Sequence, residues 1–228
     1  MPYRVGLYLG LLFTLSLTTC DRRTPPTPAA TPVPSTQTAT SAPAPRTGTT
    51  AISVQASTRP AAWAVPIVET LGLPNLYQVT ATLYRGAQPA PQGFAELKKM
   101  GIKTVVNLRA HHTDANACAA AGLDYVAIPC DTWAVNPGQI REFLKVAGDP
   151  ARQPVFIHCQ HGADRTGTMI ALYRIVAQNW TKEQAIEEMT SGGYGFHPLW
   201  QNLIDLIRQM DVQALRQTGD MTPSPATR

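Results

Sequence analysis

One short segment combines a cysteine and an arginine at a spacing that suits chemistry on phosphate. The segment reads His158-Cys-Gln-His-Gly-Ala-Asp-Arg-Thr-Gly167, and Arg165 follows Cys159 by six positions. A thiolate is a strong nucleophile, and the planar fork of an arginine can grip two phosphate oxygens at once. The segment therefore predicts attack by Cys159 on a phosphate monoester that Arg165 holds.

The residues around this pair fit an anion-binding loop. Gly162 gives the backbone freedom to curl, so that successive N–H groups can turn inward and surround an anion. A helix that begins near Thr166 would point its positive end at the same place. We expect Thr166 to donate a hydrogen bond to the thiolate and His158 to orient the loop. The residues expected to line the phosphate site are Gln160, His161, Gly162, Ala163, Asp164 and Arg165.

The elements that position this loop follow from hydrophobic patterning. Residues 154–158 form a buried strand before the loop, and a helix over 166–178 follows it. Further strands are predicted over 77–84, 103–108 and 123–128, and further helices over 92–100, 114–121, 137–147, 182–191 and 199–215. Alternating strands and helices predict an α/β fold, with a mainly parallel sheet flanked by helices. The loop then lies between the last strand and a helix, at the strand ends where such sheets bind ligands.

Residues 77–215 resemble the small dual-specificity-type protein tyrosine phosphatases. The resemblance rests on Tyr84-Arg-Gly-Ala-Gln-Pro89, on Val105-Val-Asn-Leu-Arg109 and on the loop from Cys159 to Arg165, in this order. It implies a tyrosine-phosphatase-like fold, a phosphocysteine intermediate, and no metal or other cofactor. It also implies a general acid on a loop upstream of the nucleophile, and Asp131 matches that position.

Two carboxylates compete for the role of general acid. Asp131 follows a predicted strand in Ile128-Pro-Cys-Asp-Thr-Trp133, where an aspartate is also a common turn residue. Asp164 lies inside the phosphate loop, next to Arg165, whose positive charge favours an ionised carboxylate. An ionised carboxylate cannot donate a proton, so we expect Asp131 to be the acid and Asp164 to brace the loop.

The substrate class stays open between several alternatives. The first is a phosphoprotein or a small phosphomonoester; the second is an inositol phosphate or a phosphoinositide. The loop carries no lysine or arginine besides Arg165, which favours the less charged substrates. A sulfurtransferase also places a cysteine at the head of an anion-binding loop, but the Arg-Thr-Gly ending argues against it. A non-catalytic phospho-ligand binder would not need the nucleophile.

The N-terminal part has the pattern of an export signal and a tether. Residues 1–20 contain one arginine, an apolar run and Leu17-Thr-Thr-Cys20, which resembles a lipobox with Cys20 as the lipidated residue. Residues 21–62 are rich in Thr, Pro and Ala and form a disordered linker, and residues 63–228 form the phosphatase domain. We expect an exported protein that is either membrane-anchored or periplasmic. The net charge of +4 arises before Trp63, which argues against a nucleic-acid partner.

The remaining reactive side chains have structural interpretations. Cys118 and Cys130 are either two small buried residues or, in an oxidising compartment, a disulfide. His111 and His112 are adjacent, so their side chains diverge and no metal site is expected there. For Arg85 and Arg109, which end predicted strands, we expect structural ion pairs.

Overall fold

The computed structural model describes residues 59–217. The predicted signal peptide, Cys20 and the linker up to residue 58 lie outside the described residues. The strands are β1 (Val65–Pro66), β2 (Tyr77–Thr80), β3 (Leu83–Gly86), β4 (Thr104–Arg109), β5 (Asp124–Cys130) and β6 (Val155–His158). The helices are α1 (Gly93–Lys99), α2 (Ala115–Ala121), α3 (Pro137–Gly148), α4 (Asp164–Ala177), α5 (Lys182–Ser191), α6 (Gln201–Gln209) and α7 (Val212–Gln217). None of these helices has the length and apolar character needed to cross a bilayer.

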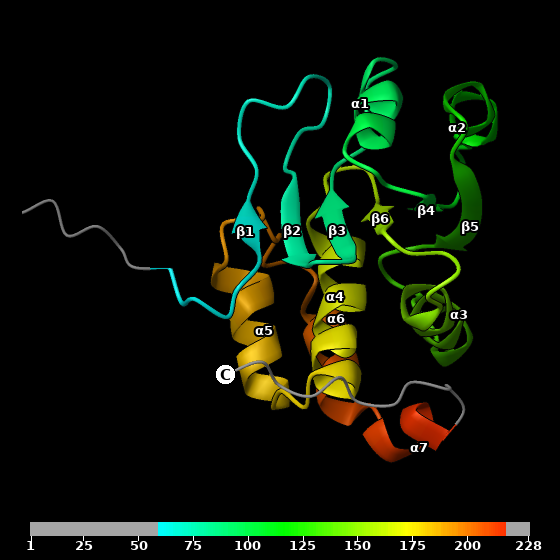
Figure 1. Cartoon of the computed structure of the whole chain (residues 1–228). Helices are drawn as coiled ribbons and strands as arrows, with labels where there is room; N and C mark the ends of the chain where they lie inside the picture. Colours follow the sequence, from blue (N-terminus) through cyan, green and yellow to red (C-terminus); the bar gives the residue numbers. More distant parts are fainter. Residues whose placement is uncertain (1–58, 218–228) are drawn as a thin grey trace, which may run out of the picture. The chain divides into compact units, whose positions relative to one another are not determined.

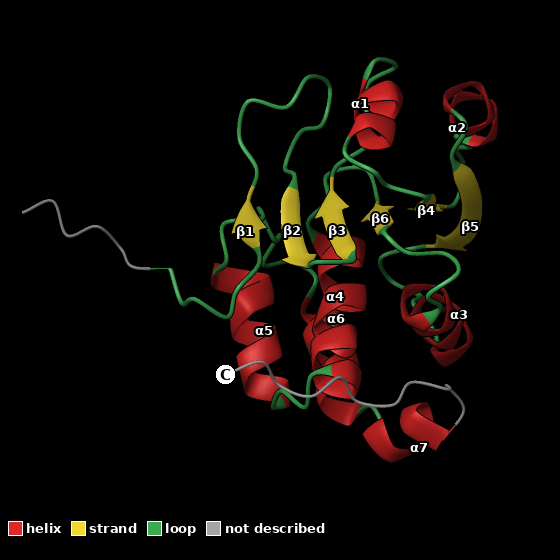
Figure 2. Cartoon of the chain, in the orientation of Figure 1, coloured by secondary structure: helices red, strands yellow, loops and turns green. Residues whose placement is uncertain are grey.

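The six strands form one mixed sheet in the order β1-β2-β3-β6-β4-β5 (Figure 1). β3, β6, β4 and β5 pair in parallel, whereas β1 and β2 add an antiparallel edge. α1 and α2 cover one face of the sheet, and α3, α4, α5 and α6 cover the other (Figure 2). The predicted α/β class with a mainly parallel, helix-flanked sheet is confirmed.

The two faces of the sheet bury separate hydrophobic cores. The smaller core, beneath α1 and α2, includes Phe94, Val105, Cys118 and Phe156. The larger core lies under the other helices. Both cores meet at β6, where all four residues are buried. A short strand that is apolar on both sides fits the centre of a covered parallel sheet, and this central position fixes the start of the loop that follows it.

Two predicted elements are each divided in two. The predicted strand 77–84 is a hairpin in which Thr80 pairs with Leu83, because the period-two alternation continues through a very tight turn. The predicted helix 199–215 breaks into α6 and α7. Oδ1 of Asp211 accepts the backbone N–H groups of Gln213 at 2.9 Å and Ala214 at 3.0 Å, which is the behaviour of a helix N-cap. An aspartate inside the pattern therefore starts a new helix.

Contacts with the domain begin ahead of the predicted boundary at Trp63. The guanidinium of Arg59 donates to the carbonyl of Gly192 at 2.5 Å and to the hydroxyl of Tyr194 at 2.7 Å. It also lies 5.2 Å from the centres of the Tyr77 and Tyr194 rings. The last residues of the predicted linker therefore pack against the segment that follows α5.

Tyr194 also contacts a buried ion pair. Its hydroxyl donates to Glu188 at 3.0 Å, and Arg174 donates two hydrogen bonds of 2.8 Å to the same carboxylate. Burial acts to raise the pKa of Glu188, but the charge and hydrogen bonds of Arg174 outweigh it and hold this pKa below its ordinary value. The pair fixes α4, α5 and Tyr194 relative to one another, and removing one partner of such a pair costs about 3–5 kcal/mol.

Candidate active site

The phosphate loop starts at the centre of the sheet. Cys159 follows β6 directly and is 2% exposed. α4 begins at Asp164, two residues earlier than predicted, so that Arg165 belongs to its first turn. The loop therefore runs from a buried strand to a helix N-terminus, as the sequence predicted.

Donors outside the loop hold the carbonyl oxygens of four successive loop residues. The pairs are Nδ1 of His158 with Cys159 O (3.2 Å), N of Gln88 with Gln160 O (3.2 Å), Nδ2 of Asn75 with His161 O (2.8 Å) and Nη2 of Arg85 with Gly162 O (2.7 Å). In a trans peptide unit the N–H group points away from the C=O group. The amides that follow these carbonyls therefore face the interior of the loop, which is the arrangement of an anion nest.

Gly162 allows the loop to lie directly on the end of β3. Its φ is +70°, and a Cβ atom there would lie 2.4 Å from the backbone carbonyl carbon of Gly86. A side chain at this position would push the loop away from the sheet. The glycine predicted to let the loop curl thus also permits this close backbone contact.

Arg85 has a different role from the ion pair that we expected. It is 1% exposed, it has no carboxylate partner within the described range, and its guanidinium lies 3.7 Å from the centre of the Tyr194 ring. Burial lowers the pKa of Arg85, while the neighbouring groups Tyr194 and Glu188 act in the opposite direction. Arg85 therefore brings a buried positive charge to the outer side of the phosphate loop, where it binds the carbonyl of Gly162. For Arg109, the guanidinium donates to the side chain of Gln88 at 3.0 Å, and it makes no ion pair with residues 59–217.

Arg165 reaches the ends of two neighbouring strands. Its Nη1 atom donates to Cys130 O at 3.2 Å and, more weakly, to Leu108 O at 3.4 Å. These contacts hold the guanidinium across the carboxyl ends of β5 and β4. Thr166 is fully buried, and among the described residues its hydroxyl has no hydrogen-bond partner. The hydrogen bond that we predicted from Thr166 to the sulfur of Cys159 is therefore not formed in this structure.

The two candidate acids lie in different surroundings. Asp131 is half-buried directly after β5, and its carboxylate makes no hydrogen bond with any residue in the described range. Asp164 is 7% exposed and accepts hydrogen bonds from both the backbone N–H and the Nδ1 of His197, each at 2.9 Å. Asp164 is thus tied to His197, which is the kind of contact expected of a bracing carboxylate. The segment 192–200, which supplies His197, packs beside the loop.

A buried polar network lies behind Cys159. Asp114, at the start of α2, accepts hydrogen bonds of 2.7 Å from Gln88 and from Asn107, and it lies 3.1 Å from Nε2 of His158. Burial acts to raise the pKa of Asp114, but the interactions with His158, Gln88 and His112 together outweigh it and lower the pKa. Nε2 of His158 lies beside this carboxylate without a hydrogen bond of good geometry, and Nδ1 of the same ring meets Cys159 O. His112 also contacts Asp114, at 3.0 Å, and is therefore part of this network.

Most of these supporting residues were not predicted from the sequence. Asn107 lies in a buried strand, and a polar side chain within Val-Val-Asn-Leu was a signal that it has a buried partner. Asp114 was predicted only as a helix start. Asn75 carried no local signal, because it reaches the loop from a distant part of the chain. His197 lies in a stretch of glycines and aromatic residues over 192–200, which was a signal of a packed turn beside the cleft.

Cys118 and Cys130 do not form a disulfide. Both thiols are free, and they belong to the two separate cores on opposite faces of the sheet. Burial raises the pKa of Cys118 to about 12 and that of Cys130 to about 12. Of the two alternatives, the structure supports two small buried residues.

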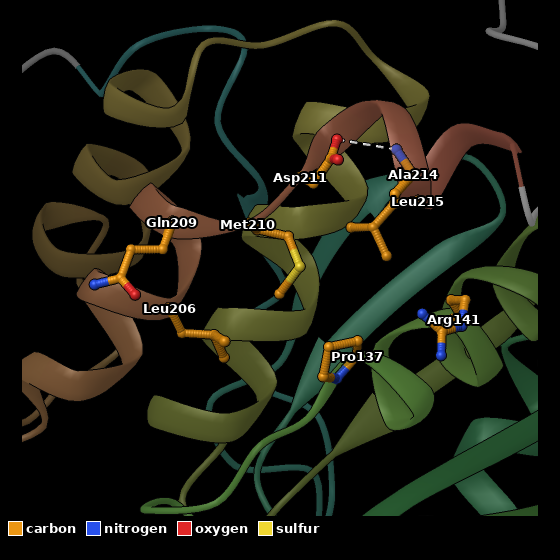
Figure 3. A pocket seen from close by; sticks show the side chains of 8 residues that line it. All are labelled: Pro137, Arg141, Leu206, Gln209, Met210, Asp211, Ala214 and Leu215. Carbon is orange, nitrogen blue, oxygen red and sulfur yellow. Dashed lines mark hydrogen bonds between the residues drawn. The ribbon is translucent and has the colours of Figure 1, made fainter.

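A separate hollow of about 370 Å³ lies between α3, α6 and α7 (Figure 3). Leu206, Met210 and Leu215 give it a mainly apolar lining, with Pro137 and Arg141 along the α3 side. None of its lining residues comes from the phosphate loop or from β6. The hollow is therefore distinct from the candidate active site at the phosphate loop.

Comparison with known proteins gives the same assignment. A sequence profile described as "DSP-PTPase phosphatase fused to NAD+ Kinase" matches residues 73–202. The Dual specificity protein phosphatase TpbA of Pseudomonas aeruginosa is 35% identical over 173 residues, which cover 74% of this chain and 78% of TpbA. Inositol diphosphatase DSP3 of Arabidopsis thaliana is 25% identical over 154 residues, covering 63% of this chain and 73% of DSP3.

The solved structures agree. The crystal structure of TpbA superposes with a TM-score of 0.62 at 34% identity, covering 70% of this chain and 98% of TpbA. A second TpbA structure, of a variant in complex with pTyr, gives a TM-score of 0.61 over 70% of this chain and 97% of that one. With the phosphate loop described above, these matches show that the chain belongs to the DSP-PTPase family of dual-specificity-type, cysteine-dependent phosphatases.

Proposed function

We propose that this phosphatase acts on phosphotyrosine and related phosphomonoesters of proteins, with Cys159 as nucleophile and Asp131 as general acid. One observation carries the proposal. Donors outside the loop bind four of its carbonyl oxygens, so the amides that follow these carbonyls are directed towards a bound phosphate. TpbA, the relative whose variant was solved with pTyr, supports the substrate class. The loop adds no lysine or arginine beyond Arg165, which suits a singly phosphorylated group.

The chemistry takes two steps. The sulfur of Cys159 attacks phosphorus, and the P–O bond to the leaving group breaks as Asp131 gives its proton to that oxygen. Arg165 and the loop amides stabilise the charge on the three non-bridging oxygens. Water then attacks the phosphocysteine, Asp131 takes a proton from it, and the P–S bond breaks. Phosphate leaves, and Thr166 can stabilise the departing thiolate by a hydrogen bond.

A substrate panel tests the proposal. Phosphotyrosine, phosphoserine and phosphothreonine peptides, inositol phosphates, phospholipids and nucleotides are offered to the purified protein, with Cys159→Ser as the inactive control. We expect the highest kcat/KM for phosphotyrosine peptides. Preference for an inositol phosphate by tenfold or more would instead favour the second candidate, which the similarity to Inositol diphosphatase DSP3 supports.

For the cellular location we propose export and a membrane anchor at Cys20. The support is the apolar run after Arg4 that ends in Leu17-Thr-Thr-Cys20, followed by a Thr- and Pro-rich stretch that suits a tether. Metabolic labelling with a radioactive fatty acid in a bacterial host tests it, with Cys20→Ser as control. Absence of label, together with a mature N-terminus elsewhere, would leave a soluble exported enzyme.

A further inference from the structure

Three side chains at the rim of the phosphate loop are of types that ligate metal ions, and none of them forms or breaks a bond in the proposed phosphatase reaction. They are His161 and Asp164 from the loop and His197 from the segment after α5, and their ligand atoms all lie within 4.8 Å of one another. We propose that His161, Asp164 and His197 bind one divalent transition-metal ion of the Zn²⁺ type.

Two of the three ligands lie close to the separation that zinc needs. Nδ1 of His197 lies 2.9 Å from Oδ2 of Asp164. Two ligands that each lie about 2.0–2.1 Å from a tetrahedral zinc ion are about 3.3–3.4 Å apart, so these two atoms must separate by about 0.4–0.5 Å. The other oxygen of Asp164 accepts the backbone N–H of His197 at 2.9 Å, which holds the carboxylate in place. A zinc ion can therefore replace the hydrogen between Nδ1 and Oδ2 with little movement of either group.

The third ligand can move to complete the set. The ring centre of His161 lies 5.6 Å from that of His197. Its side chain is exposed and makes no hydrogen bond with the described residues, whereas its backbone carbonyl is held by Asn75. A ring nitrogen of His161 already lies within 4.8 Å of the other two ligand atoms, and no hydrogen bond among the described residues has to be broken for this side chain to move.

The ligand types favour zinc over the hard cations. Two imidazoles and one carboxylate suit Zn²⁺ and similar transition metals, whereas Mg²⁺ and Ca²⁺ prefer oxygen ligands. A site with three protein ligands leaves a further position for water. To bind a metal ion through Nδ1, the ring of His197 must carry its hydrogen on Nε2, in place of the tautomer that donates to Asp164.

Calorimetric titration with ZnCl₂ tests the site. The parent protein carries Cys159→Ser and Cys20→Ser, because the active-site thiol and the thiol near the N-terminus could both compete for zinc. We expect one ion per chain with a micromolar dissociation constant. His161→Ala should weaken binding by at least about tenfold, whereas His111→Ala, which removes an exposed histidine outside the set, should leave it unchanged. His161→Ala should keep the parent's unfolding temperature in the absence of zinc.

Two results would overturn the proposal. One is a failure of the parent to bind zinc, or equal affinity in the parent and in His161→Ala. The other comes from the protein with Cys159 intact, titrated with Co²⁺ as a spectroscopic probe. Co²⁺ bound by imidazole and carboxylate ligands shows only visible d–d bands. Co²⁺ bound by a thiolate also shows an intense near-ultraviolet charge-transfer band. We expect the former spectrum, and we expect it to disappear in His161→Ala.

Discussion

The phosphate loop and the loop after β5 carry the groups that we propose to react, and the fold holds these groups in opposite ways. Four carbonyls of the phosphate loop are fixed by donors from β3, β6 and the segments next to them. In the loop that follows β5, the carboxylate of Asp131 makes no hydrogen bond with the described residues, and Trp133 is 70% exposed. Asn202 holds only the backbone of this loop, through the carbonyl of Thr132 at 2.9 Å.

The difference corresponds to two tasks. Groups that stabilise charge in a transition state act best when they are fixed in advance, because no reorganisation is then needed. A proton donor must approach the leaving oxygen after the substrate has entered, so some freedom is useful. Under the proposed mechanism, Asp131 has this freedom and Asp164, tied to His197, does not.

Removing the nucleophile should have the largest effect on turnover. Cys159→Ser should lower kcat on p-nitrophenyl phosphate by about 10⁴-fold or more, because a hydroxyl of high pKa cannot replace a thiolate. Tungstate binding should persist, since the backbone groups of the loop are unchanged. Cys118→Ala, in the opposite core, is the control. Activity of Cys159→Ser within tenfold of wild type would refute the assignment of the nucleophile.

Arg165→Lys should be the next most severe change. A lysine ammonium cannot reach two strand-end carbonyls and two phosphate oxygens in one plane, so we expect kcat/KM to fall about 10²- to 10³-fold. Arg109→Lys, at a strand end but bound to Gln88, serves as control and should retain most activity. Equal losses in the two variants would show that the phosphate loop has no special need for the guanidinium.

The comparison between the two loops is tested most directly by replacing each carboxylate. Asp131→Asn should lower kcat by about 10²-fold or more on alkyl phosphates and far less on activated aryl phosphates, whose leaving groups need no proton. Asp164→Asn should reduce activity to a similar degree on both, through a looser phosphate loop. Kinetics on a series of leaving groups distinguish the variants, and the opposite pattern would place the acid inside the phosphate loop.

Arg85 offers a test of the rigidity of the phosphate loop. Arg85→Gln removes the donor to Gly162 O, so the loop amides should lose their alignment. We expect about tenfold weaker tungstate binding and a similar loss in kcat/KM. Arg216→Gln is the control for the loss of a partly buried charge. Arg216 donates to the backbone carbonyl of Ile175 and to the side-chain oxygen of Asn179 instead of to the phosphate loop. Unchanged tungstate affinity in Arg85→Gln would show that the loop holds its shape without this donor.

The smallest effect concerns stability in acid. The folded-state pKa of Asp114 is lowered, so its ionised form stabilises the fold above the ordinary aspartate pKa, and this contribution is lost as the pH falls through the folded value. As the pH drops below about 4, the free energy of unfolding should therefore fall less steeply in Asp114→Asn than in the wild type. The difference between the two slopes corresponds to at most one bound proton. Urea unfolding at several pH values measures this slope, and Asp124→Asn on the surface is the control. An unchanged slope would exclude this role for Asp114.

Local signals were enough to predict the reacting groups and most of the elements. Cys159 and Arg165 lie in one short segment whose strand, loop and helix each have their own pattern. Two predicted elements were too long, because the hydrophobic pattern continues across the end of one element into the next. The two places are the hairpin turn after Thr80 and the start of α7, where Asp211 caps the helix. The donors that shape the loop could not be predicted, because Asn75, Arg85 and His197 reach it only after the sheet has formed.

The contacts of Arg59 also bear on how the enzyme is best shortened for experiments. Arg59 packs on Tyr194, Tyr194 lies against Arg85, and Arg85 holds the carbonyl of Gly162. A catalytic fragment cut at Trp63, where the sequence places the boundary, would lack the first member of this series. A fragment that starts several residues before Arg59 keeps it, and it is the better choice for crystallisation and inhibitor screening.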